Sequence, residues 1–227
     1  MCFSAEASFI AAAGTGSIGL ATFNRERSTS LRWLALAPGF FALQQASEGL
    51  VWLHLNGNIE AAPLSRIAQY IYLMFAMVFW PTYAPLAVTM SEKVRFRRIL
   101  CSLIVVVGLL VSVFNAFQLV ISSEAPAVLG HSIKYGYGDG YFPWRLTYGI
   151  VSMIPLFISS LRKMWLLGGL ALMGFVVADA LYYEAFISVW CFYAAVLSII
   201  LYFILKDNEK DCAATITSGI DIAANAI

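Results

Sequence analysis

The sequence predicts an all-α integral membrane protein, a bundle of seven transmembrane helices. Of its 227 residues, 61% are hydrophobic and 12% are charged, whereas an average soluble domain is about 25% charged. The apolar residues gather in long runs, and a helix needs about 20 mostly apolar residues to cross a bilayer. Composition and run length together indicate that lipid, not water, surrounds most of the chain.

Seven apolar runs define the expected helices, and short polar links separate them. The predicted spans are residues 3–23, 33–55, 65–90, 97–121, 143–160, 164–184 and 186–205. No link is long enough to join independent domains. We therefore expect one transmembrane domain over residues 1–206 and a short cytoplasmic tail over residues 207–227.

The basic residues predict the orientation, because cytoplasmic loops carry an excess of Lys and Arg. With the N-terminus outside, only Arg66, Lys134 and Arg145 of the 14 basic residues fall on the outer side. This distribution predicts an outer N-terminus and an inner C-terminus.

The net charge and the cysteine spacing exclude several classes of function. A net charge of +1 without a basic stripe gives no surface for a nucleic-acid partner. Cys2, Cys101, Cys191 and Cys212 show no CxxC spacing, so a zinc ribbon and a thioredoxin-like motif are absent. Cys2 and Cys191 are both expected near the outer side, either as a disulfide or as two free thiols.

Three polar residues interrupt the second apolar run. Gln44, Gln45 and Glu48 are spaced three and four residues apart, so they share one helix face. A charge at the centre of a span costs about 2.5–3.5 kcal/mol on insertion scales. Intramembrane ionisable groups usually face the bundle interior and mark functional sites, so this face is the first candidate site.

Further polar residues are expected at the same depth, in the outer half of the bundle. They open or close the fourth, fifth and sixth spans, whereas the inner half is nearly apolar. Arg145 is expected to pair with either Glu48 or Asp179. The sequence thus predicts an outward-opening pocket for a small polar ligand or cation, lined by Gln45, Glu48, Asn115, Gln118, Arg145, Asp179 and Tyr182.

The outer link at residues 131–144 alternates Tyr and Gly. Glycine permits tight turns, and long ordered loops often act as lids. The pattern predicts a short hairpin or flap over the pocket mouth. An aromatic belt at the membrane interface explains the same residues equally well.

Metal and retinal binding have less support. A His-rich zinc site is excluded because the chain has two histidines, but a carboxylate site for a divalent metal stays open. The candidate metal ligands are Cys2, Glu6, Glu48, His131 and Asp179. Retinal attachment is not expected, because the last span has no lysine between Val189 and Leu205.

Two short motifs carry a resemblance to a known family. The start Met1-Cys2-Phe3-Ser4-Ala5 and the segment from Gln44 to Trp52 resemble a family of uncharacterised bacterial integral membrane proteins, which share an MCFSA start and a QQxxEGLVW segment. The resemblance implies a location in the bacterial cytoplasmic membrane. It directs attention to Cys2, Gln45 and Glu48, and it supplies no activity.

Three hypotheses for function follow. The first is a sensor or carrier that binds a small polar ligand or cation in the outer pocket. The second is a membrane-embedded enzyme that acts on a lipid or small molecule at the outer leaflet, with Glu48 or Asp179 as acid or base and with or without a metal. The third is a structural or assembly subunit whose polar cluster only ties helices together. In that case, loss of Glu48 or Arg145 mainly lowers stability.

Overall fold

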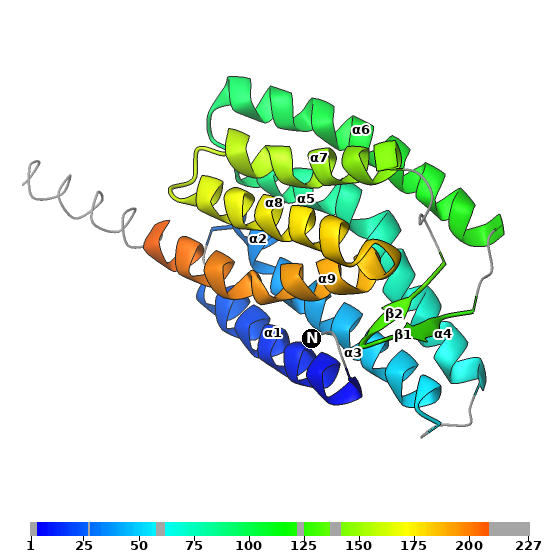
Figure 1. The fold of residues 1–227 in the computed structure, drawn as a ribbon. Coiled ribbons are helices and arrows are strands. Elements are labelled where there is room, and N and C mark those ends of the chain that lie inside the picture. The colour runs from blue at the N-terminus through cyan, green and yellow to red at the C-terminus, as the bar shows by residue number, and fades with distance from the viewer. Residues whose placement is uncertain (1–3, 27, 58–61, 122–124, 137–141, 209–227) are drawn as a thin grey trace, which may run out of the picture.

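The helices lie close to where the apolar runs predict them. A computed structural model describes residues 4–26, 28–57, 62–121, 125–136 and 142–208. Seven helical segments run along one another in this part of the chain (Figure 1). The elements are α1 (Ala5–Arg25), α2 (Arg32–Ala35), α3 (Ala37–Leu55), α4 (Ala62–Leu73), η1 (Met74–Phe79), α5 (Trp80–Ser91), α6 (Arg95–Ile121), β1 (Ala127–Leu129), β2 (Ser132–Lys134), α7 (Phe142–Ile158), α8 (Met164–Leu181), η2 (Tyr183–Ala185) and α9 (Phe186–Val196), with helix continuing to Asn208.

Four helical segments are long and apolar enough to cross a membrane. They are Pro63–Ser91, Arg95–Ile121, Met164–Leu181 and Tyr183–Asn208, and they indicate an integral membrane protein. The helices α1, α3 and α7 are not among them, so length and hydropathy do not support the predicted count of seven spans.

The outward face of α6 is strongly apolar. Only 28% of the most apolar stretch of this helix is buried within the protein. A large exposed apolar surface is unfavourable in water and suits contact with lipid tails. Its exposed large apolar side chains include Phe96, Ile99, Leu103, Val106, Leu110, Val113, Phe117 and Val120.

Small residues let α1 and α3 pack closely together. α1 packs along α3, and a Cβ added to Gly19 would lie 2.8 Å from the backbone nitrogen of Gly39. Helices in membranes commonly pack through such small residues. This packing leaves α3 between α1, α4 and α9, so its polar residues lie in the interior.

The helical segment Pro63–Ser91 changes from α-helix to π-helix and back near its middle. A π-helical turn, η1, joins α4 to α5 and is followed by Pro81, which has no N–H to donate. The side-chain amide nitrogen of Asn115 on α6 donates to the carbonyl oxygen of Met77 in this turn at 2.7 Å. Such π-helical turns frequently occur at functional sites.

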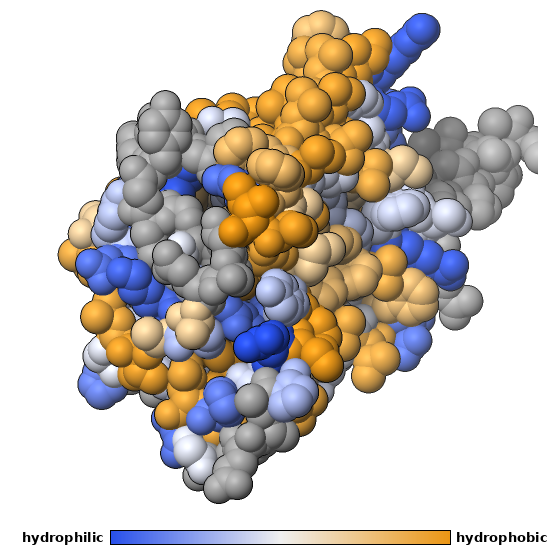
Figure 2. Space-filling model, turned by 90° about the vertical axis from the view of Figure 1, so that its right-hand side faces the viewer, coloured by the Kyte–Doolittle hydropathy of each residue, from blue (hydrophilic) through white to orange (hydrophobic). Residues whose placement is uncertain are grey.

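A small hairpin covers one end of the bundle. β1 and β2 pair antiparallel around Gly130, whose φ is 60°, as expected at the first loop position of a type II′ turn. A hairpin was predicted in this link, but it precedes the Tyr/Gly repeat, and residues 137–141 lie outside the described part. Figure 2 looks onto this end, where hydrophilic residues gather, while its upper flank is hydrophobic.

The opposite end is tied together by polar contacts between loops. The Glu92 carboxylate, after α5, accepts hydrogen bonds from the Ser160 hydroxyl at 2.6 Å and the Ser160 backbone N–H at 2.7 Å. Lys163 pairs with Asp207 at 2.6 Å. These contacts hold the link between α7 and α8 against α5 and the end of the last helix.

Candidate functional site

The centre of the bundle holds a buried polar cluster on α3. Gln44, Gln45 and Glu48 are all 0% exposed. The Ser188 hydroxyl of α9 donates to Oε1 of Glu48 at 2.6 Å, and the Trp80 indole N–H of α5 donates to Oε1 of Gln44 at 2.7 Å. Three helices therefore meet at the one-sided polar face that the spacing of the α3 residues predicts.

Many polar atoms of this cluster have no hydrogen-bond partner among the described residues. Gln45 lies beside the Glu48 carboxyl, but neither of its polar atoms reaches hydrogen-bonding geometry. An unpaired buried polar atom costs about 1–3 kcal/mol, so such a concentration is unusual. The unpaired atoms on α3 are Oε2 of Glu48, Oε1 and Nε2 of Gln45, Nε2 of Gln44 and Nε1 of Trp52.

The hairpin contacts this cluster through two tyrosines. The ring of Tyr135, which follows β2 and is 2% exposed, stacks on the ring of Tyr72 in α4 with centroids 4.8 Å apart. The Tyr72 hydroxyl donates to the Ile187 carbonyl at 3.3 Å and lies beside the Glu48 carboxyl. Movement of the hairpin would therefore disturb the surroundings of Glu48.

Arg145 pairs with Asp179, one of its two predicted partners. Its Nη1 lies 3.3 Å from Oδ1 of Asp179 and donates to the Tyr183 carbonyl at 3.1 Å. The guanidinium also lies over the Tyr183 ring, 3.8 Å from its centroid. This pair joins α7 to α8 and η2, while Glu48 forms no ion pair with any described residue.

The remaining predicted pocket residues lie elsewhere. Asn115 is buried and serves the π-helical turn, whereas Gln118 is half-buried on the same helix. Tyr182, 37% exposed, ends α8 and borders an open groove beside His131. The described contacts thus do not join the seven predicted residues into one pocket. They form one group around Glu48 and a second around Arg145.

The candidate metal ligands are also dispersed. Glu6 and His131 are exposed, at the start of α1 and in the hairpin turn respectively, while Glu48 is buried. No group of three or more His, Cys, Asp or Glu side chains forms among the described residues. Cys2 lies outside the described part, and Cys191 is a buried free thiol.

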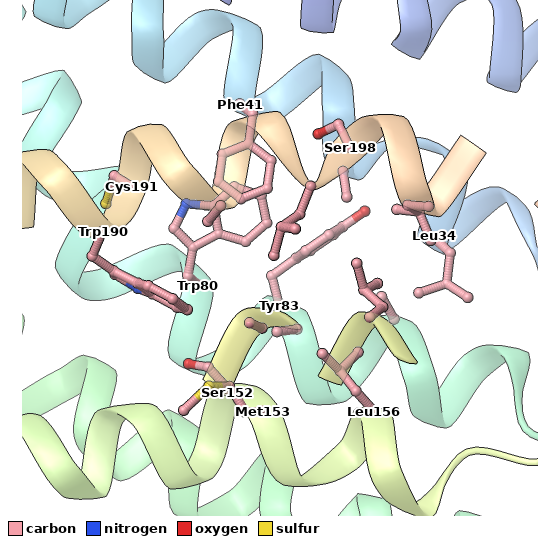
Figure 3. Close-up of a pocket in the computed structure, with 18 of the residues that line it drawn as sticks. Leu34, Phe41, Trp80, Tyr83, Ser152, Met153, Leu156, Trp190, Cys191 and Ser198 are labelled. Carbon is pink, nitrogen blue, oxygen red and sulfur yellow. The ribbon is translucent and has the colours of Figure 1, made fainter. Parts of the chain in front are cut away.

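A separate apolar cavity lies beside the polar cluster. Its volume is about 120 Å³, and α2, α3, α5, α7, α8 and the last helix contribute to its wall (Figure 3). Trp80, which lines this cavity, stacks on Phe41 at 4.0 Å between centroids and donates to Gln44 of the polar cluster. The aromatic lining residues are Phe41, Trp80, Tyr83, Tyr148 and Trp190.

Sequence reasoning missed Ser188, Tyr72 and Trp80 as parts of the site. Each is a single polar or aromatic residue within an apolar run, where such residues are ordinary. Their role depends on which helices pack together, and no spacing within one run carries that information. The same holds for the cavity, because its aromatic residues come from different helices.

Comparison with other proteins supplies a family but no activity. Neither the curated proteins nor the solved structures contain a match to this chain. A family model described as a family of unknown function (DUF6629) matches residues 1–216. This match covers the whole bundle, and the chain belongs to that family of unknown function.

Proposed function

We propose that this protein is a membrane-embedded binding protein whose site, centred on Glu48 and Gln45, takes a small, positively charged polar ligand. The observation that carries the proposal is the set of unpaired polar atoms around a fully buried carboxylate. In this proposal the chain acts as a sensor or a carrier.

The proposal includes seven spans with the N-terminus outside. α1 has 21 residues and α3 has 19, close to the length that crosses the hydrocarbon core. α7 is shorter but apolar. The basic residues support the orientation, because they collect at the end opposite the hairpin. That end then faces the cytoplasm, and the hairpin covers the outer opening.

The charge of the ligand follows from the charge of the site. A buried carboxylate is costly unless a cation or several donors compensate it. Ser188 supplies one donor, and Arg145 lies instead against Asp179. A ligand with a positive charge would compensate Glu48 where the described side chains do not.

The donors around Glu48 favour an organic cation over a bare metal ion. Metal sites are built from oxygen, sulfur or imidazole ligands. Here Nε2 of Gln44, Nε2 of Gln45 and Nε1 of Trp52 all present unpaired N–H groups. An ammonium or guanidinium compound that also carries a hydrogen-bond acceptor matches both kinds of group.

The unpaired atoms also distinguish this proposal from a purely structural role. A cluster that only ties helices gains stability by pairing its polar atoms across the interface. Gln45 is 0% exposed, and neither of its polar atoms bonds to a residue that the structure describes. Such a residue lowers the stability of the unliganded bundle. A ligand that forms hydrogen bonds with it would offset this cost.

Access to the site requires a movement, because Glu48 is completely covered. The hairpin is the candidate moving part. It is held to α4 by the stack of Tyr135 on Tyr72, and Tyr72 also lies beside Glu48. A ligand that enters from the hairpin end would meet this tyrosine before the carboxylate.

Native mass spectrometry of protein purified from cell membranes tests the proposal. The variants are Gln45→Leu, which breaks no described hydrogen bond, and Glu48→Gln. Gln118→Leu is the matched control, because it removes a half-buried amide on another helix. We expect a stoichiometric small cation on the wild type and the control, and its loss from both site variants.

A folding measurement accompanies the mass spectra. Gln45→Leu should melt at or above the wild-type temperature once the ligand is removed, because it replaces an unpaired amide by an apolar group. If the wild type carries no small molecule, or if Glu48→Gln keeps it, the binding role of this cluster is wrong.

A further inference from the structure

The apolar cavity between α5, α7, α8 and α9 has the size of a single ring. Its volume is about 120 Å³, and an engineered protein cavity of about 150 Å³ binds benzene. Aromatic side chains form much of its wall, with Trp80 and Tyr83 on one side and Trp190 at one end (Figure 3). Flat rings pack well against such walls.

Two serine hydroxyls of the cavity lining have no hydrogen-bond partner in the described part of the chain. They are Oγ of Ser152 on α7 and Oγ of Ser198 on the last helix. Ser198 is 2% exposed. In Figure 3 the two serines enter from different sides of the cavity.

These serines differ from several other helical hydroxyls of the chain. Ser and Thr in a helix commonly donate to the carbonyl four residues earlier. Ser102 does so at 2.8 Å, Ser47 at 2.9 Å and Thr22 at 2.6 Å. Ser152 and Ser198 form no such bond, and both residues line the cavity, so each hydroxyl keeps a free donor and acceptor there.

We propose that this cavity binds a lipid-soluble, single-ring aromatic or quinonoid molecule that carries an oxygen atom on each of two opposite edges. The aromatic walls hold the ring, and the hydroxyls of Ser152 and Ser198 bond to the two oxygens. The ligand enters from the bilayer. This site is distinct from the Glu48 cluster, because neither Gln45 nor Glu48 lines the cavity.

The test compares two ring compounds that differ only in their oxygens, 2,5-dimethylhydroquinone and para-xylene. The melting temperature of the purified full chain is followed at increasing free ligand concentration, since a ligand that binds the folded state raises it. We expect the hydroquinone to bind the wild type at least about fivefold more tightly, the effect of one ordinary hydrogen bond.

The serine variants identify the groups responsible. Ser152→Ala and Ser198→Ala should each weaken hydroquinone binding by about fivefold and leave para-xylene binding unchanged. Ser102→Ala is the control, because that exposed hydroxyl bonds to its own helix. Ala194→Leu and Ala171→Phe, which add volume to the lining, should abolish the effect of both compounds.

Two results would overturn the inference. One is equal affinity of the wild type for both compounds, which would make the cavity purely apolar. The other is a melting temperature that neither compound changes. Gln45→Leu should bind the hydroquinone normally, so failure here is distinguishable from failure of the proposed cation site.

Discussion

The Ser188 hydroxyl donates to the Glu48 carboxylate at 2.6 Å across 140 residues of sequence. It joins α9 to α3 at full burial, since both residues are 0% exposed. One oxygen of Glu48 is thereby fixed, while Oε2 is unpaired among the described residues. The carboxylate is thus oriented by the protein and still has an acceptor to offer.

We predict that Ser188→Ala and Glu48→Gln are energetically coupled. Polar contacts between membrane helices contribute on average about 0.6 kcal/mol, with a maximum near about 1.7 kcal/mol. A double-mutant cycle of unfolding in mixed micelles should give about 1 kcal/mol, because the bond is short and buried. Ser102→Ala combined with Glu48→Gln is the control and should give additive effects. Additivity in the Ser188 cycle would contradict the bond.

We predict that exchanging Arg and Lys lowers stability more at position 145 than at position 134. Arg145→Lys keeps the charge but loses the flat contact with the Tyr183 ring. We expect unfolding to cost about 1–2 kcal/mol less, the strength of a desolvated cation–π contact. Lys134→Arg, in the exposed pair with Glu184, should change stability by less than about 1 kcal/mol. Equal stability of Arg145→Lys and wild type would refute the stacking role.

The predictable part of this fold is local in the sequence. Apolar runs predict where helices lie because a membrane-spanning segment must satisfy its backbone hydrogen bonds within its own helix. The pair of Arg145 with Asp179 was foreseeable, because few basic residues lie at the hairpin end. The bond from Ser188 to Glu48 and the cavity hydroxyl of Ser198 were not, because each depends on how distant helices pack and rotate.

The predicted pocket gives a second example of what the sequence could not predict. Depth along each helix placed Asn115 near Glu48 in the prediction, but depth says nothing about direction around the helix. The structure directs Asn115 to Met77 in the π-helical turn. A run of apolar residues does not reveal a π-helical turn, so the need for this amide was invisible in the sequence.

That contact predicts a stability role for Asn115. Asn115→Ala leaves the Met77 carbonyl without its side-chain donor and should lower the free energy of unfolding by about 1–3 kcal/mol. Hydrogen exchange should increase within residues 74–79. Gln118→Ala, a half-buried amide on the same helix, is the control and should have little effect. An unchanged exchange pattern would show that the π-helical turn does not need Asn115.

Glu92 predicts a loss of stability in acid. Burial alone would raise the pKa of Glu92, but hydrogen bonds from Ser160 and nearby backbone amides outweigh it and hold the pKa below its usual value of 4.5. A carboxyl group with a lowered folded pKa stabilises above the unfolded pKa, and this contribution disappears as pH falls through the folded pKa. Melting temperatures below pH 4.5 should therefore fall more steeply for wild type than for Glu92→Gln. Glu184→Gln should follow the wild-type curve, and parallel curves for all three would contradict the prediction.

Gly108 lies at a steric limit that is set by the backbone of a neighbouring helix. It lies where α6 crosses α5, and an added Cβ would overlap the carbonyl oxygen of Pro81. A backbone atom cannot move aside as a flexible side chain can, so Gly108→Ala should cost about 1–3 kcal/mol by overpacking. Gly169→Ala is the matched control, because no atom lies within 4 Å of its added Cβ and alanine favours the helix by about 0.8–1 kcal/mol. Thermal unfolding should thus move in opposite directions for the two variants. A stabilised Gly108→Ala would mean that α5 and α6 are farther apart than the structure places them.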